Sequence, residues 1–333
     1  MNIAVVGSGG WGTALAILLH NNGHQVAMWS FSQKEVDYIQ AHHENELLRG
    51  VVIPQEISLT TDISVVAGKD LVVSAVPSFA VRQTAEKMKE HLTPGTVLVS
   101  VTKGIERDTA KRMSEILTEV TGHTVAVLSG PTHAEEVGRG VPTGCVVACP
   151  DRAVAERVQD VFMSPSFRVY AGQDIVGVEL GAALKNIYAL VAGVLDGAGC
   201  GDNTKALMMT RGLTESARLG VALGAQRETF AGLSGVGDLI VTCCSMHSRN
   251  HRCGILIGQG KKTQEAMKEV GAVVEGYYAA ASAHDLARKT GIEMPIAEAA
   301  YQALYEGLGV EDAIRMLMGR SRRHEIEENW LQR

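Results

Sequence analysis

One lysine stands in a setting that favours acid–base chemistry. Lys185 lies in the segment ELGAALKNIYAL at 179–190, which reads as a helix. On a helix it shares its face with three small residues that leave room for a ligand: Gly181, Ala182 and Ala189. An ordinary surface lysine is the competing interpretation. Asn186 beside it and GDNTKA at 201–206 add polar groups to an apolar region, and they favour a site.

A second polar cluster lies in LSGVGDLIVTCCSMHSRN at 233–250. Asp238 ends a glycine-rich turn there. Ser248, Arg249 and Asn250 combine a hydroxyl, a guanidinium and an amide, all of which can donate to phosphate oxygens. Because each charge-assisted hydrogen bond is worth about 1.5 to 3 kcal/mol, the cluster predicts an anchor for a small phosphorylated substrate.

Zinc is the competing interpretation of the same region. Five possible ligands fall within eleven residues: Cys243, Cys244, His247, His251 and Cys253. Their spacing matches no zinc knuckle, and adjacent cysteines do not readily share one tetrahedral ion. We therefore expect no metal.

The stretch VVGSGGWGTALA at 5–16 is rich in glycine and small residues, so a ligand or another chain segment can approach its backbone closely. Gly7, Gly9 and Gly12 fit G-x-G-x-x-G between an apolar run and a helical segment, the context in which this fingerprint binds a dinucleotide. The first glycine permits a tight turn, the second admits a pyrophosphate, and the third allows close packing of helix and strand. Trp11 packs either over the cofactor or in the core.

The sequence gives a weaker signal for which cofactor binds, NAD or NADP. An enzyme restricted to NAD usually carries an acid at the end of the second strand, where it binds the 2′-hydroxyl. Residues 29–34 read WSFSQK and contain no acid, whereas hydroxyls and Lys34 would tolerate a 2′-phosphate. The hypothesis is therefore NADPH or dual use.

Short apolar runs alternate with helical stretches in the first half of the chain and predict a doubly wound α/β fold with a mostly parallel sheet. We expect strands at 2–7, 24–30, 71–77, 95–102, 124–130, 144–149 and 167–172. Helical patterns then continue, so we expect a dinucleotide-binding domain at 1–174 and a helical substrate domain at 175–333. The charged segment 319–333 reads as a solvated helix.

Parallel strands bring the loops after their carboxyl ends to one edge, beside the glycine turn. The segments 76–79, 102–104 and 129–136 meet there, which makes Lys103, Thr132 and His133 candidates to face a ligand. The alternatives are structural. The prolines in these loops also terminate strands, and His133 can simply begin a solvated helix.

Composition bounds the partners. The chain has 333 residues, 46% of them hydrophobic, and a net charge of −6 with no basic block, which argues against nucleic acid and an anionic membrane. No run of 18 apolar residues and no secretion signal is visible, and six scattered cysteines suit reduced thiols, so we expect a cytoplasmic protein without membrane insertion. The Ala- and Gly-rich helical half is compatible with a homodimer.

Nine segments, in order, resemble the bacterial-type NAD(P)-dependent sn-glycerol-3-phosphate dehydrogenases: GSGGWGTALA, AVPS, TKGIE, GPTHAEEV, ELGAALKNIYALVAG, GDNTKALMMTRG, GVGDLIVTC, HSRN and VVEGY. The resemblance implies a Rossmann-type domain followed by an all-α C-terminal domain like that of 6-phosphogluconate dehydrogenase. It implies NAD or NADP as cofactor. It also implies interconversion of dihydroxyacetone phosphate and sn-glycerol 3-phosphate, which supplies glycerophospholipid synthesis.

The same resemblance implies roles for individual residues. Lys185 corresponds to the general acid/base, with Lys103 and Asp238 as further catalytic candidates. The substrate-binding positions are Lys103, Gly130, Thr132, Lys185, Asp238, Ser248, Arg249 and Asn250. The cofactor-binding positions are Gly7, Gly9, Gly10, Trp11, Gly12, Phe31, Lys103, Ala134, Arg249, Val273 and Glu275. Two positions depart from the family: Phe31 replaces a residue that is often basic or polar, and Gly10 replaces one that is often larger.

The implied chemistry agrees with the residues present. Reducing a ketone needs a hydride from nicotinamide C4 and a proton for the developing alkoxide, which Lys185 can give. Two alternatives stay open: a related two-domain dehydrogenase acting on another hydroxy or phosphorylated substrate, and a nicotinamide sensor without turnover. The sensor would need a DNA-reading or docking module, and none is visible in the sequence.

Overall fold

The computed structural model describes residues 1–322, 324 and 325. The chain forms two compact units. The first unit is Met1–Glu106 with Lys111–Glu179, and the second is Arg107–Ala110 with the chain from Leu180 onward. The domain boundary expected at 174/175 stays a prediction.

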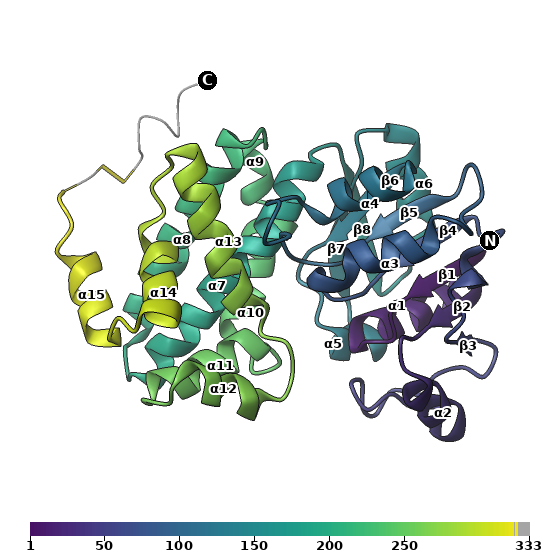
Figure 1. Cartoon of the computed structure of the whole chain (residues 1–333), viewed down its shortest axis with the longest axis horizontal. Helices are drawn as coiled ribbons and strands as arrows, with labels where there is room; N and C mark the ends of the chain where they lie inside the picture. The colour runs from purple at the N-terminus through teal and green to yellow at the C-terminus, as the bar shows by residue number, and fades with distance from the viewer. Residues whose placement is uncertain (323, 326–333) are drawn as a thin grey trace. The chain divides into compact units, whose positions relative to one another are not determined.

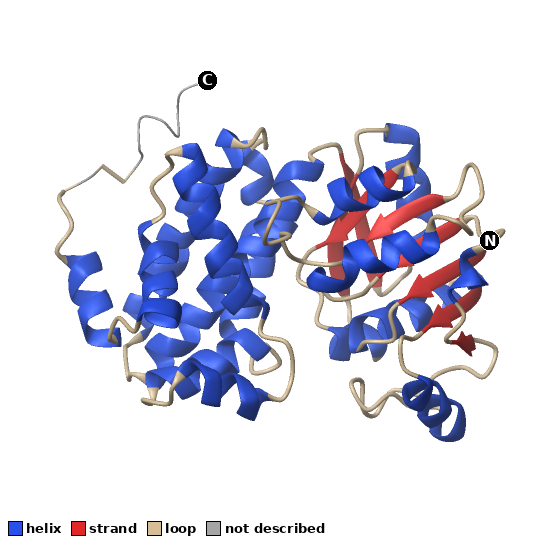
Figure 2. Cartoon of the chain, viewed as in Figure 1, coloured by secondary structure: helices blue, strands red, loops and turns tan. Residues whose placement is uncertain are grey.

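The first unit contains an eight-stranded sheet in the order β3-β2-β1-β4-β5-β6-β7-β8 (Figures 1 and 2). Neighbouring strands from β3 to β6 pair in parallel, β7 is antiparallel to β6, and β8 is parallel to β7. The doubly wound, mostly parallel sheet is therefore confirmed. The strands are β1 (Asn2–Val6), β2 (Gln25–Trp29), β3 (Ser58–Thr60), β4 (Leu71–Ser74), β5 (Val97–Ser100), β6 (Val125–Ser129), β7 (Thr143–Ala148) and β8 (Phe167–Gly172).

Both faces of this sheet are covered, which explains the unbroken apolar runs. Along β1, Ile3 and Val5 join one hydrophobic cluster, whereas Ala4 and Val6 join another. Since successive side chains of a strand point to opposite faces, each cluster lies on its own side of the sheet. The helices of the first unit are α1 (Gly10–Asn21), α2 (Gln33–His42), α3 (Val81–Met88), α4 (Met113–Thr121), α5 (Ala134–Gly138) and α6 (Arg152–Phe162), with 3₁₀ turns η1 (Ile63–Val66) and η2 (Ser78–Ala80).

The second unit is helical where it is described, which confirms the all-α prediction (Figure 2). Helix α7 spans Ile175–Gly197, and its part from Leu180 onward belongs to this unit. The elements that follow are α8 (Asp202–Ala222), α9 (Arg227–Phe230), η3 (Leu233–Gly237), α10 (Asp238–Cys244), α11 (Arg249–Gly258), α12 (Thr263–Val270), α13 (Glu275–Thr290), α14 (Pro295–Tyr301), η4 (Gln302–Glu306) and α15 (Val310–Met318). The segment expected to form a helix at 319–333 has no helix at 319–322, 324 and 325. Its other residues lie outside the described part of the chain.

Helices α7 and α11 pack backbone to backbone. A Cβ atom added at Gly193 would lie 2.0 Å from the carbonyl oxygen of His251, and one added at Gly254 would lie 2.0 Å from that of Leu190. Gly197 and Gly258 repeat the contact one turn further along, each with a carbonyl oxygen at 2.2 Å. Only glycine permits an approach this close, so these four positions fix how α11 crosses α7.

Among the described residues, α7 is the one single helix long and apolar enough to cross a membrane. The helices at Arg227–Cys244 and Arg249–Gly258 meet the same criteria only if they are taken together as one bent span. Within its most apolar window, 83% of α7 is buried inside the protein, as is typical of a core helix.

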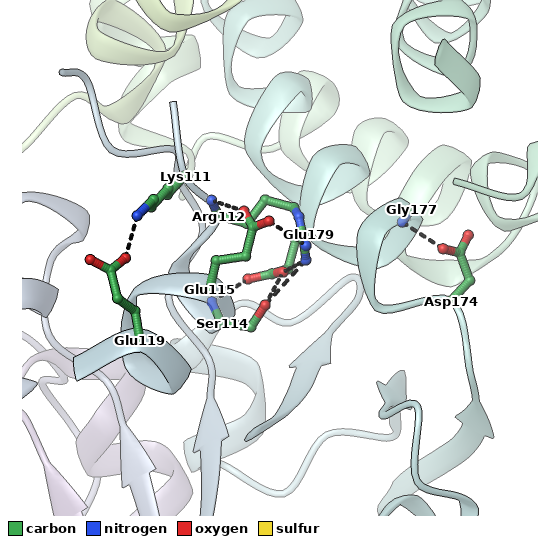
Figure 3. A network of polar contacts seen from close by, with 8 residues as sticks. All are labelled: Lys111, Arg112, Ser114, Glu115, Glu119, Asp174, Gly177 and Glu179. Carbon is green, nitrogen blue, oxygen red and sulfur yellow. Dashed lines mark hydrogen bonds and ion pairs between the residues drawn. The ribbon is translucent and has the colours of Figure 1, made fainter. Parts of the chain in front are cut away.

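The first turns of α7 are held by a polar network with α4 (Figure 3). The buried carboxylate of Glu179 accepts hydrogen bonds from the Ser114 backbone N–H at 2.8 Å, the Ser114 hydroxyl at 2.5 Å and Arg112 Nη1 at 2.6 Å. Burial raises the pKa of Glu179, although the charge of Arg112 opposes that shift. Asp174 caps the helix by accepting the Gly177 N–H at 2.9 Å.

The glycine turn makes a stability prediction. A Cβ atom at Gly12 would lie 2.0 Å from the carbonyl oxygen of Gly7, whereas one at Gly9 would have no described atom within 4 Å. We expect Gly12→Ala to lower the free energy of unfolding by about 1–3 kcal/mol, because backbone atoms must shift to make room. Gly9→Ala is the matched control and should unfold close to the wild-type temperature. Equal thermal midpoints for the two variants in a calorimetric scan would contradict this account of the turn.

Candidate active site

The glycine turn combines two packing glycines with one open position. Gly7 has φ +123°, and a Cβ atom there would lie 2.7 Å from backbone atoms of Ala75. Gly12 contacts Gly7 in turn, so both are required by the fold itself. Gly9, the N-cap of α1, has open space at its Cβ position among the described residues, which is where backbone approach by a pyrophosphate needs it.

The other candidates around α1 sort into packed and open positions. Gly10 is glycine for a local reason, since a Cβ atom there would lie 2.6 Å from the carbonyl oxygen of Leu47. Its Cβ position is also 3.8 Å from Ala134 Cβ, which brings these two cofactor candidates together. Trp11 is half-buried and packs against the core cluster of the sheet, which supports the structural interpretation of that residue. The backbone N–H groups of this first helical turn form the positive end of α1.

The end of β2 holds an expected residue and an unexpected one. Phe31 is 79% exposed, with the ammonium of Lys87 lying 5.5 Å from its ring centroid. Glu35 was missed by the sequence analysis. Its Oε2 accepts hydrogen bonds from the hydroxyls of Ser8 and Ser30, both at 2.7 Å. The available signal was a carboxylate one residue past the segment 29–34.

Three candidates converge on the carbonyl of Gly130. That oxygen accepts hydrogen bonds from Lys103 Nζ at 3.1 Å and from the Thr132 hydroxyl at 3.0 Å. A Cβ atom at Gly130 would lie 2.8 Å from Cys145 Cα, so glycine is needed there. His133 is the N-cap residue of α5 and is half-buried, in keeping with the interpretation of this segment as a helix start.

In the second unit, Lys185 is buried with two polar neighbours from α10. Its ammonium lies 2.9 Å from Asp238 Oδ1 and donates to the Thr242 hydroxyl at 2.5 Å. The Thr242 hydroxyl donates to the backbone carbonyl of Asp238 at 2.6 Å, so its lone pairs face the lysine. Thr242 was missed by the sequence analysis, although it lies one helical turn after Asp238 and therefore on the same face.

The sequence predicts space for a ligand beside the small residues that share the helix face of Lys185. At the first of these residues, Gly181, that space is filled. A Cβ atom at Gly181 would lie 2.8 Å from the backbone oxygen of Ser234 in η3. The small residue therefore admits the neighbouring backbone at that point, not a ligand. Lys185 itself is only 6% exposed.

Asn250 is a structural link as well as a candidate ligand. Its side chain donates to Asn186 Oδ1 at 2.9 Å and accepts the Gly276 N–H at 2.8 Å. These bonds join α7, α11 and the start of α13, where the half-buried Glu275 and, just before it, Val273 lie. The amide retains one N–H beyond the bond to Asn186.

Ser248 and Arg249 form the start of α11. Ser248 is the N-cap, and its hydroxyl accepts the His251 N–H at 3.2 Å. Arg249 is exposed at the first helical position, where its guanidinium can meet an anion. His251 Nε2 lies 2.7 Å from Asp196 Oδ2, and Lys205 Nζ lies 2.6 Å from Asp196 Oδ1, which anchors the same helix end to α7 and α8.

Within the part of the chain that the structure describes, no group of three or more His, Cys, Asp or Glu side chains has the geometry of a metal site. Cys243 and Cys253 are buried, while Cys244 is exposed. Burial raises the pKa of the Cys243 thiol to about 12, against the influence of the Lys185 charge.

The second unit also contains a cavity of about 880 Å³ between α7, α8, α14 and α15. Apolar side chains line most of it, and Arg211 and Arg218 lie at its wall. Lys185, Asp238 and Arg249 do not line it. Because the chemistry-bearing residues are elsewhere, this cavity is not the candidate active site.

Comparison with known proteins identifies the family. Residues 2–155 match the description "NAD-dependent glycerol-3-phosphate dehydrogenase N-terminus", and residues 174–315 match the corresponding C-terminus. The chain belongs to the NAD-dependent glycerol-3-phosphate dehydrogenase family. It is 54% identical over 328 residues to a glycerol-3-phosphate dehydrogenase [NAD(P)+] of Moorella thermoacetica, covering 98% of each chain.

Two further similarities support the family assignment. A glycerol-3-phosphate dehydrogenase [NAD(P)+] of Desulfitobacterium hafniense is 51% identical, over 98% of this chain and 93% of that protein. The crystal structure of glycerol-3-phosphate dehydrogenase from Coxiella burnetii has a TM-score of 0.92 at 35% identity, covering 96% of this chain and 99% of that one. A ketopantoate reductase from Ralstonia eutropha is 16% identical with a TM-score of 0.62, covering 91% of this chain and 97% of that one, and it shares the fold.

The buried pair in this family member makes a stability prediction. Asp238→Ala leaves the ammonium of Lys185 buried without its carboxylate, so we expect the free energy of unfolding in urea to fall by about 3–5 kcal/mol. Asp238→Asn keeps the shape of the side chain but removes its negative charge. It should therefore also destabilise the protein. Arg152→Ala, which breaks the exposed pair with Glu156, should leave stability nearly unchanged. A wild-type urea midpoint for Asp238→Ala would contradict the structural importance of the pair.

Proposed function

We propose that this chain catalyses the reversible NAD(P)H-dependent reduction of dihydroxyacetone phosphate to sn-glycerol 3-phosphate, the precursor of glycerophospholipids. The observation that carries the proposal is the match of both halves of the chain to glycerol-3-phosphate dehydrogenases. The buried Lys185, with Asp238 and Thr242 beside it, supports the proposal by offering a proton donor for that reaction.

The dinucleotide fits the glycine turn. Gly9 leaves open space at the positive end of α1, where backbone N–H groups can bind a pyrophosphate. The proposed contacts of the cofactor are Gly7, Gly9, Gly10, Trp11, Gly12, Phe31, Lys103, Ala134, Arg249, Val273 and Glu275. When bound, the reduced nicotinamide supplies a hydride.

The protein's own residues handle the proton and the phosphate. Lys185 donates a proton to the carbonyl oxygen of the substrate as negative charge develops there. Asp238 Oδ1 lies 2.9 Å from the Lys185 ammonium and holds it in place for the transfer. Lys103 contributes a second positive charge, as electrostatic stabilisation of an alkoxide needs.

The phosphate of the substrate needs hydrogen-bond donors that are not already used in bonds within the protein. Arg249 is exposed and suits charge-assisted bonds to phosphate oxygens. Ser248 can still donate its hydroxyl proton, since its cap bond uses a lone pair, and Asn250 retains one N–H. Gly130 and Thr132 complete the proposed substrate positions beside Lys103.

We further propose a cytoplasmic protein that uses no metal, does not bind nucleic acid and does not insert into a membrane. The net charge of −6 and six free cysteines support this assignment. A homodimer is a compatible assembly for the Ala- and Gly-rich helical half.

An absorbance assay at the nicotinamide band tests the activity. Dihydroxyacetone phosphate should be reduced with NADH or NADPH, and ketopantoate and acetoacetyl thioesters should be turned over far more slowly. A faster reaction with either of those compounds would favour the alternative, a related two-domain dehydrogenase.

The role of Lys185 makes a catalytic prediction. Lys185→Ala should lower turnover of dihydroxyacetone phosphate by at least about 10²- to 10⁴-fold, because a positioned acid/base contributes that much, while NADH binding persists. Lys262→Ala removes an exposed lysine and serves as the matched control. Near-normal turnover by Lys185→Ala would reassign the proton transfer, first to His133.

A further inference from the structure

A fixed carboxylate lies where the glycine turn meets the end of β2. Glu35 Oε2 accepts hydrogen bonds at 2.7 Å from Ser8, between the first two glycines of the turn, and at 2.7 Å from Ser30, the residue directly after β2. Both serines are buried, whereas Glu35 as a residue is exposed. One carboxylate oxygen is therefore held by the protein while the side chain stays accessible to a ligand.

Helix capping does not explain this placement. Ser32 is the N-cap of α2 and Glu35 is three residues later, a capping-box spacing in which the glutamate side chain would bind the Ser32 N–H. In the structure that N–H donates to the Ser30 hydroxyl at 3.1 Å instead. The carboxylate of Glu35 is turned away from its own helix end and toward the glycine turn.

We propose that Glu35 determines the choice of cofactor by favouring NADH over NADPH. Dinucleotide-binding folds place the adenosine ribose beside the glycine turn and the end of the second strand, where a carboxylate binds the 2′-hydroxyl and repels a 2′-phosphate. Residues 29–34 lack an acid, which led to the expectation of NADPH or dual use. Glu35 supplies that acid from the following residue, across the first turn of α2.

The other charges nearby moderate this preference. Lys87 lies over the exposed ring of Phe31 at 5.5 Å, so a cation is also present at this end of β2. Lys87 and Lys34 are both exposed on flexible stems, whereas the carboxylate of Glu35 is held by two buried hydroxyls. We therefore expect a graded preference, with NADH bound about tenfold more tightly than NADPH.

Direct binding tests this inference without turnover. Dissociation constants for NADH and NADPH are measured by nicotinamide fluorescence, with no dihydroxyacetone phosphate present, for the wild type, Glu35→Gln and Glu35→Ala. Both variants should reduce the NADH preference about tenfold, mainly through tighter NADPH binding, because both remove the charge. Asp37→Asn is the matched control, since Asp37 is an exposed acid on the same helix that binds Gln33, and its ratio should equal that of the wild type.

This inference rests on the proposed function only in assuming that the protein binds a dinucleotide. The possible results therefore distinguish a failure of the inference from a failure of the proposed function. A ratio that changes less than twofold in a folded Glu35 variant overturns the role of Glu35, as does a wild-type preference for NADPH. Equal weakening of both nucleotides assigns Glu35 a purely structural role and also overturns the inference. A wild type that binds neither nucleotide refutes the proposed function itself.

Discussion

The crossing of α7 and α11 is the constraint on which the catalytic half depends. Four glycines let the two backbones touch, and no side chain larger than hydrogen fits at the contact. This crossing places Asn186, next to Lys185, within hydrogen-bonding distance of Asn250, next to Arg249. The proposed proton donor and the proposed phosphate anchor are thus spaced by main-chain packing, which is more rigid than contact between long side chains.

A buried ammonium is costly unless it is neutralised, and this cost explains the composition around Lys185. Asp238 supplies the opposite charge, and the Thr242 hydroxyl supplies an acceptor whose own proton is used by a backbone carbonyl. Stability and the proposed acid role therefore require the same carboxylate.

Much of this organisation could be read from the sequence, because it is local. The glycine turn, the apolar strands and the change to helices follow from spacing and periodicity. The strand β3 was missed because three residues carry too little pattern. The face beside Lys185 was misjudged because helical spacing shows that residues are small but not what fills the space, and at Gly181 the backbone of η3 fills it.

Glu35 shows a different limit of sequence analysis. Its position relative to Ser32 fits a helix cap, and local rules favour that interpretation. Ser30 is 1% exposed and offers its hydroxyl to the Ser32 N–H, so the cap is satisfied without the carboxylate. The hydroxyls of Ser8 and Ser30 both bond the carboxylate of Glu35 and hold it beside the glycine turn. The placement of the proposed cofactor-selecting charge thus depends on a hydrogen bond between residues 27 positions apart, which no window of neighbouring residues contains.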